Sequence, residues 1–166
     1  NIFSVYMPST WSSNHSKIDS KELADRLKIN SSTMPIKTIM SCFEESLKES
    51  LDFNPIGIAN QNIQSRIRGT LLMALANQNH HLLLSTGNKS ELAVGYCTLY
   101  GDMNGGLSVI GDLYKTNVFK LCSWIDSKES IDSRKIYKLA IDKKIIGNNI
   151  LTKSPSAELG PNQLDT

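Results

Sequence analysis

The stretch that decides the fold is LLLSTGNKSELAVGYCTLYGDMNGG, Leu82–Gly106. It begins with a short apolar run typical of a buried strand, continues into a helical pattern and ends in a glycine-rich loop. In open parallel sheets, ligands bind in the crevice beyond the carboxyl ends of the strands. Thr86 supplies a hydroxyl at such an end, Gly87 lets the backbone approach a ligand, and a helix that starts near Asn88 presents N–H groups to an anion. The stretch therefore predicts a phosphate-binding site.

The whole chain has an ordinary globular composition. It contains 166 residues, of which 40% are hydrophobic and 20% charged, and this favours one domain. A net charge of +2 gives no overall attraction to nucleic acid or to a membrane surface, and no apolar run reaches the roughly 18 residues of a membrane span. The cysteines at 42, 97 and 122 are too far apart for a zinc or redox motif, so we interpret them as reduced core thiols. We expect a soluble, cytoplasmic protein with no nucleic-acid or membrane partner.

Strand and helix patterns alternate along the chain. We expect strands at 2–8, 33–36 and 81–86, and helices at 20–29 (with Ser20 as N-cap), 36–51, 59–78, 89–96 and 113–125. The helix at 59–78 has the clearest pattern, because Ile63, Ile67, Leu71 and Leu75 form one apolar stripe. Such alternation predicts an α/β fold, a Rossmann-like parallel sheet with helices on both faces.

Several charged residues lie near the predicted crevice, but their spacing alone does not assign them a role. Glu91 falls in the first turn of a helix, where its commoner role is to favour the helix dipole. Lys115 lies just inside another predicted helix and could neutralise a triphosphate, although most exposed lysines are merely solvated. Arg66 and Arg68 flank the apolar stripe and carry the two-pronged guanidinium that binds phosphate or carboxylate. The residues alone thus indicate a nucleotide-binding α/β domain and go no further.

Four phrases in this order resemble the synthetase domain of NAD synthetases. They are NIQSRIRGTLLMALAN, LSTGNKSELAVGYCTLYGDMNGG, IGDLYKT and KSPSAELGPNQ. The likeness covers nearly the whole chain, is densest from Asn62 to Lys115, and is closer to the glutamine-dependent enzymes than to the ammonia-dependent ones. It implies the adenine nucleotide alpha hydrolase-like fold of the ATP pyrophosphatases.

The resemblance also implies a reaction. An NAD synthetase amidates deamido-NAD to NAD: the nicotinate carboxylate attacks the α-phosphorus of ATP, pyrophosphate leaves, and ammonia displaces AMP from the acyl-adenylate. Mg²⁺ is expected on the phosphates. A homodimer or higher homo-oligomer is expected, with ammonia supplied by a glutaminase domain elsewhere in the full protein.

Residue by residue, the resemblance implies two sets of contacts. The ATP-binding set is Met7 (through its backbone), Thr86, Lys115 and Ser156, and the deamido-NAD-binding set is Asn62, Arg66 and Glu91. Glu91 also matches a metal ligand, and the likeness assigns no catalytic residue.

The chain departs from the family pattern at both ends. The phosphate-binding turn Ser-Gly-Gly-x-Asp-Ser is expected before Asn1 and a closing loop beyond Thr166, so residues 1–166 are expected to be a synthetase domain that lacks both and is inactive alone. Thr10-Trp11 stands where arginine and a smaller aromatic are more usual. Two alternatives stay open: another ATP pyrophosphatase amidoligase, such as one that aminates a purine nucleotide, and a non-catalytic dimerisation or binding fragment.

Overall fold

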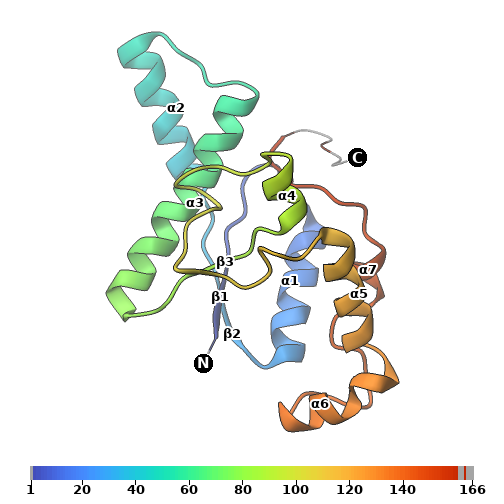
Figure 1. The fold of residues 1–166 in the computed structure, drawn as a ribbon. Coiled ribbons are helices and arrows are strands. Elements are labelled where there is room, and N and C mark those ends of the chain that lie inside the picture. Colours follow the sequence, from blue (N-terminus) through green and yellow to red (C-terminus); the bar gives the residue numbers. More distant parts are fainter. Residues whose placement is uncertain (1, 161–162, 164–166) are drawn as a thin grey trace. The chain divides into compact units, whose positions relative to one another are not determined.

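The computed structural model describes residues 2–160 and 163, and it confirms an α/β protein with parallel strands (Figure 1). The chain divides into two compact units. The first unit consists of Asn1–Met34 and Thr116–Thr166, and the second is the continuous stretch Pro35–Lys115. Residue 1, residues 161–162 of the KSPSAELGPNQ phrase and residues 164–166 lie outside the described residues.

The first unit starts with a strand–helix–strand segment. Its elements are β1 (Phe3–Tyr6), α1 (Asn14–Leu27) and β2 (Asn30–Thr33). The two strands pair in parallel, from Phe3 opposite Asn30 to Tyr6 opposite Thr33. Because parallel strands need a crossover connection, α1 lies between them in sequence and contacts both.

Helix α1 begins earlier than the sequence predicted. Ser13, and not Ser20, is its N-cap residue: the Ser13 hydroxyl accepts a hydrogen bond from the backbone N–H of Ser16 at 3.1 Å. A hydroxyl at this position satisfies one of the N–H groups that a helix leaves unpaired at its start. Ser20 lies inside the helix, where its hydroxyl donates to the carbonyl of Lys17.

The second strand also lies elsewhere than predicted. The apolar residues at 33–36 suggested a strand there, but β2 is the polar stretch Asn30–Thr33, with all four residues exposed. Backbone pairing with β1 forms this strand, and it continues as the Met34 N–H donates to the Tyr6 carbonyl at 2.8 Å. Ile36 is fully buried and is instead the N-cap residue of the next helix.

Four short helical elements complete the first unit. They are α5 (Lys115–Ile125, whose first residue belongs to the second unit), η1 (Lys128–Ser130), α6 (Ile131–Ile136) and α7 (Asn148–Thr152). The Asp126 carboxylate, just after α5, accepts hydrogen bonds of 2.7–2.9 Å from three successive backbone N–H groups at 145–147. Burial would raise the pKa of Asp126, but these N–H groups and nearby Lys144 lower it. A charged Asp126 thus anchors the loop before α7.

The second unit packs two long helices together and carries a small parallel sheet. Its elements are α2 (Lys37–Leu51), α3 (Ile58–Asn79), β3 (Leu84–Ser85), α4 (Lys89–Ala93) and β4 (Leu107–Ser108). Helices α2 and α3 lie side by side in Figure 1, and β3 pairs in parallel with β4. The predicted helix at 59–78 is confirmed, although only Ile67 of its four stripe residues is fully buried.

Three further predictions need correction. The structure describes two two-stranded parallel sheets, one in each unit, where one sheet was expected. Helix α4 ends at Ala93, because Gly95 turns the chain with a φ of +70°. The three cysteines are free, as expected, but none is buried and Cys42 is exposed. Within residues 2–160, no helix combines the length and the apolar character needed to cross a membrane.

Candidate functional site

Asp102, in the glycine-rich loop of the second unit, is held in a defined orientation. Its backbone N–H donates to Ser65 Oγ at 3.0 Å, and its Oδ1 atom lies 3.3 Å from the same hydroxyl. Asp102 Oδ1 also accepts a hydrogen bond of 2.6 Å from the backbone N–H of Thr98. Ser65 lies on α3 and is only 8% exposed. The Asp102 carboxylate is therefore fixed both by a long helix and by its own loop.

Asn62 and Arg66, on either side of Ser65, contact the start of the same loop. Asn62 Oδ1 accepts a hydrogen bond from Thr98 Oγ1 at 2.8 Å, and Arg66 Nε donates to the Leu99 carbonyl at 3.2 Å. Both side chains thus hold the loop in this structure. The Asn62 amide N–H groups and the terminal guanidinium nitrogens of the exposed Arg66 are not used in these bonds.

Two glycines permit the close approach of this loop to α3. A Cβ atom on Gly69, in the middle of α3, would lie 2.8 Å from the Gly101 carbonyl oxygen and 2.9 Å from that of Tyr100. A Cβ atom on Gly101 would in turn meet Ser65. Because these contacts are with backbone or buried atoms, they have little room to relax. Glycine is required at both positions for the helix and the loop to touch.

The loop, α4 and the two short strands enclose a pocket of about 210 Å³. Its polar lining comes from four side chains, those of Ser85, Glu91, Asp102 and Ser108. Whole small-molecule sites measure about 300–1,000 Å³, so this pocket accommodates part of a nucleotide-sized ligand. These two carboxylates and two hydroxyls supply its polar groups, and glycine, cysteine and apolar residues make up the rest of the lining.

The start of α4 differs from the predicted phosphate site. Asn88 and Glu91 form a reciprocal cap, in which each backbone N–H donates to the other side chain, at 3.0 and 3.2 Å. The N–H of Lys89 donates to the Leu113 carbonyl at 2.9 Å. The prediction that these N–H groups are unpaired is wrong, because the cap satisfies those of Asn88 and Glu91 and the Leu113 carbonyl satisfies that of Lys89. Glu91 therefore has the structural role that its spacing indicated, in addition to lining the pocket.

Neither Thr86 nor Lys115 lines the pocket. Thr86 stands between the pocket residues Ser85 and Gly87, and its side chain is exposed. The backbone N–H of Lys115 donates to Ser90 Oγ of α4 at 3.0 Å, which fixes where α5 begins. Of the seven residues implied by the resemblance, five belong to the second unit (Asn62, Arg66, Thr86, Glu91 and Lys115).

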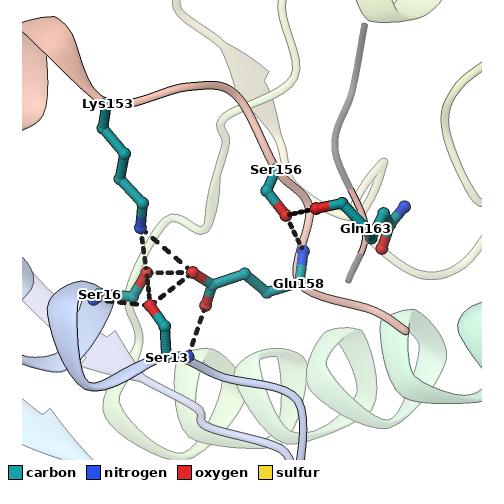
Figure 2. Close-up of polar contacts among 6 residues, drawn as sticks. All are labelled: Ser13, Ser16, Lys153, Ser156, Glu158 and Gln163. Carbon is teal, nitrogen blue, oxygen red and sulfur yellow. Dashed lines mark hydrogen bonds and ion pairs between the residues drawn. The ribbon is translucent and has the colours of Figure 1, made fainter. Parts of the chain in front are cut away.

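Met7 and Ser156 belong to the first unit. Met7 directly follows β1 and is partly buried. Ser156 Oγ donates to the Gln163 carbonyl at 2.6 Å and accepts a hydrogen bond from the Glu158 N–H at 3.2 Å. Its hydroxyl is therefore oriented by the backbone of its own segment (Figure 2).

Figure 2 shows a polar cluster around Glu158, which we define as Ser13, Ser16, Lys153 and Glu158. Glu158 Oε1 accepts hydrogen bonds from the two serine hydroxyls at 2.7 Å and from Lys153 Nζ at 3.1 Å. Glu158 Oε2 accepts a hydrogen bond from the backbone N–H of Ser13 at 3.0 Å. Burial would raise the pKa of Glu158, but the hydrogen bonds from Ser16 and Ser13 and the contact with Lys153 lower it to about 2.

This lowered pKa predicts how acid destabilises the cluster. A carboxyl whose pKa falls from 4.5 in the unfolded chain to about 2 in the folded one stabilises the fold fully above pH 4.5. That stabilisation is lost as the pH falls through about 2. We expect the difference in melting temperature between wild type and Glu158→Gln to be largest near pH 7 and to shrink steadily below pH 4.5. A difference that is the same at pH 7 and pH 3 would contradict the assignment.

The sequence did not single out Ser65, Asp102 or Glu158. A glycine inside a helical pattern costs about 1 kcal/mol relative to alanine, so Gly69 was a signal of close backbone approach on α3. That signal pointed toward Ser65 and the loop that it contacts. No local signal pointed to Glu158, because its partners on α1 are 142–145 residues away in the chain.

The pocket has oxygen ligands of the kind that Mg²⁺ prefers. Glu91 and Asp102 both line it, and Mg²⁺ in nucleotide sites commonly takes one or two carboxylates together with the phosphates of the substrate. Among the described residues no group of three or more acidic, histidine or cysteine side chains gathers into a complete protein cage. Glu91 and Asp102 are therefore the residues of this pocket that would hold a cation bound jointly with phosphate.

Comparisons with known proteins agree along the whole chain. A family model described as NAD synthase matches residues 1–166. A glutamine-dependent NAD(+) synthetase from Synechocystis sp. is 51% identical over 166 residues, which are 100% of this chain and 27% of that protein. The chain therefore spans about a quarter of the length of such curated relatives.

Two solved structures have the same fold. The glutamine-dependent NAD+ synthetase from Acinetobacter baumannii, in complex with ADP, matches with a TM-score of 0.78 and 40% identity, over 92% of this chain and 27% of that one. The NMN synthetase from Francisella tularensis matches with a TM-score of 0.74 and 28% identity, over 98% of this chain and 59% of that one. With every residue covered by the family match, and with close relatives and shared folds in agreement, this chain belongs to the NAD synthase family.

Proposed function

We propose that this chain is part of a carbon–nitrogen ligase that amidates deamido-NAD to NAD at the expense of ATP, releasing AMP and pyrophosphate. Residues 1–166 contribute to its synthetase domain, and the ammonia comes from glutamine. The observation that carries the proposal is the 51% identity, over every residue, with a glutamine-dependent NAD(+) synthetase. The ADP bound to the Acinetobacter baumannii relative supports an adenine nucleotide as one ligand.

The reaction needs activation of a poor electrophile. A carboxylate does not react with ammonia, so its oxygen attacks the α-phosphorus of ATP and pyrophosphate departs. Ammonia then adds to the carbonyl carbon of the acyl-adenylate, loses a proton, and expels AMP. Orientation of the two substrates and neutralisation of phosphate charge account for most of such catalysis.

Each candidate residue has a proposed role in this scheme. Thr86, Lys115, Ser156 and the backbone at Met7 bind ATP, and Asn62, Arg66 and Glu91 bind deamido-NAD. Glu91 and Asp102 hold Mg²⁺, which, when bound, offsets the charge of the phosphate oxygens. The fixed orientation of Asp102 supports its place in this set, to which the family resemblance alone did not lead. A homodimer or higher homo-oligomer in the cytoplasm is the setting that we propose.

The test is the stoichiometry of the reaction. The intact gene product is incubated with ATP, MgCl₂, deamido-NAD and either glutamine or ammonium, and nucleotides are separated by chromatography. We expect equal amounts of NAD and AMP, with both nitrogen sources. If no AMP is released with any substrate, the chain is part of a non-catalytic binding protein.

One competing function has a specific observation in its favour. The Francisella tularensis relative is an NMN synthetase and shares the fold over 98% of this chain. The same assay is therefore repeated with nicotinate mononucleotide. It is also repeated with an oxopurine nucleotide, which would be the substrate if the protein were the amidoligase that aminates a purine nucleotide. A kcat/KM higher for either of these than for deamido-NAD would overturn our choice of substrate.

Arg66 provides a test of the deamido-NAD assignment. We expect Arg66→Ala to raise the KM for deamido-NAD by roughly 10-fold or more, because a charge-assisted hydrogen bond contributes about 1.5–3 kcal/mol. Arg66→Lys keeps the charge without the two-pronged geometry, so its KM should fall between those of wild type and Arg66→Ala. A rise in the KM for ATP instead would mean that the two ligand assignments are exchanged.

A further inference from the structure

Glu158 has a backbone conformation that glutamate rarely adopts. Its φ is +52°, in the left-handed region, where a residue with a Cβ atom is disfavoured by roughly 1–2 kcal/mol and glycine is not. A turn that served only to reverse the chain would favour glycine or asparagine here. Such strained residues persist where surrounding contacts determine them, and they often mark functional segments. The side chain of Glu158 is therefore the part to explain.

That side chain completes the cap of a distant helix. In a reciprocal helix cap, the N-cap hydroxyl binds the N–H three residues later, and a carboxylate at that later position binds the N-cap N–H. In α1 the first half is present, from Ser16 N–H to Ser13 Oγ, but the later position is serine. Glu158, 145 residues away, accepts the Ser13 N–H in its place. It also supplies the negative charge that the first turn of α1 otherwise lacks.

Lys153 and Ser16 make this contact cooperative. Lys153 Nζ donates to Ser16 Oγ at 2.7 Å, and Ser16 Oγ donates to Glu158 Oε1 at the same distance. Lys153 also pairs directly with Glu158, whose side chain is only 16% exposed. Because the Glu158 carboxylate is mostly buried and Ser16 Oγ is hydrogen-bonded to both charged groups, the pair holds the segment more firmly than a fully exposed pair does.

The cluster joins two stretches of the first unit that carry candidate ATP contacts. Met7 lies at the start of the loop that ends at Ser13, and Ser156 lies within the segment between Lys153 and Glu158. The Glu158 N–H donates to Ser156 Oγ, so the backbone strain at Glu158 and the orientation of the Ser156 hydroxyl are directly linked (Figure 2).

We propose that Glu158 is a positioning residue for ATP: through Ser13, Ser16 and Lys153 it holds the loop after Met7 and the segment of Ser156 in the arrangement that receives the nucleotide. This inference rests on the proposed function for the reaction in which ATP is consumed, but what it claims about Glu158 concerns ATP binding. Glu158 itself need not touch the substrate.

Three variants of the intact gene product test this role. Glu158→Gln keeps the shape and removes the charge, whereas Glu158→Gly removes the side chain and relieves the backbone strain. Glu129→Gln, at an exposed glutamate of the same unit, is the control. We expect the KM for ATP to rise about 5-fold in Glu158→Gln and about 10-fold or more in Glu158→Gly, since one or more charge-assisted hydrogen bonds are lost. The kcat at saturating ATP and the KM for deamido-NAD should stay within about twofold of wild type.

A purely structural Glu158 predicts different results. If Glu158 serves only to form the left-handed turn, Glu158→Gly will have a melting temperature equal to or above that of wild type and an unchanged KM for ATP. That result would overturn the proposal. A lowered melting temperature with an unchanged KM for ATP overturns it equally. Should the Glu158 variants not fold, Ser16→Ala and Ser16→Thr decide: we expect a raised KM for ATP in the first and its restoration in the second, which keeps the hydroxyl. Equal KM values for ATP in Ser16→Ala and Ser16→Thr would contradict the positioning role of Glu158.

Titration calorimetry with ATP separates this inference from the proposed function. If wild type binds ATP but makes no NAD, the proposed function fails, and the Kd values of the variants still decide the role of Glu158. If wild type makes NAD and the variants bind ATP as tightly as wild type, the role of Glu158 fails alone. If wild type does not bind ATP, both are overturned.

Discussion

Replacing Lys115 by alanine is expected to raise the KM for ATP by roughly 10–100-fold while leaving the fold intact, because a lysine contact with phosphate contributes about 1.5–3 kcal/mol. The position of Lys115 at the start of α5 is fixed through its backbone N–H, which donates to Ser90 Oγ. Alanine retains that N–H and is a good helix former. The substitution thus removes the ammonium group and its alkyl chain beyond Cβ but leaves the start of the helix in place.

Steady-state assays of NAD formation at varied ATP, together with a melting curve, measure this effect. Lys120→Ala, at an exposed position of the same helix, is the matched control and should leave the KM for ATP unchanged. Lys115→Arg keeps the positive charge and should retain much of the affinity. An unchanged requirement for ATP in Lys115→Ala would remove this residue from the ATP-binding set.

Gly69→Ala is expected to destabilise the protein, by about 1–2 kcal/mol net, although alanine is the better helix former. Helix propensity alone favours alanine inside α3 by about 1 kcal/mol. The new methyl group, however, would lie 2.8–2.9 Å from two backbone carbonyl oxygens of the glycine-rich loop. Forcing extra volume into a packed contact typically costs about 1–3 kcal/mol, and more where backbone must move. Packing therefore outweighs propensity at this position.

The melting temperature of the intact gene product reports this change, and we expect it to fall. Thr70→Ala, at the next and exposed position of α3, is the control and should be neutral or slightly stabilising. Because the loop also positions Asp102, Gly69→Ala should also lower the rate of NAD formation at temperatures where the variant is still folded. Stabilisation by Gly69→Ala would show that the glycine-rich loop can move away from α3 at little energetic cost.

Sequence patterns predicted the elements whose signals are local. The apolar spacing of α2 and α3 and the alternation of strands and helices were sufficient for these helices and for the α/β class. Pairing between distant segments was harder to predict. β2 forms from the polar residues 30–33 because β1 supplies hydrogen-bond partners, and Ser13 rather than Ser20 caps α1 because of contacts at that loop. The pairing of β2 has no signature within its own stretch of residues.

The candidate site divides in the same way. The phrase from Leu82 to Gly106 led to the pocket and to Glu91, because a strand, a turn and a helix follow one another there. The local pattern also predicted unpaired N–H groups at the start of α4. In the folded chain Glu91 and Leu113 accept hydrogen bonds from these groups. Asp102 and Glu158 acquire their orientation from α3 and α1, and only the folded chain brings these partners together.

The distance in sequence between Ser13 and Glu158 sets an order for events on the ribosome. At about 5–20 residues per second, the glutamate is synthesised roughly 7–29 s after the serine, which lies 145 residues earlier. The stretch Pro35–Lys115 is continuous and can fold during that interval, whereas the unit that contains α1 waits for its later half. Nascent chains stalled before residue 158 should therefore protect the middle of the sequence from proteases while the start of α1 remains open to cleavage.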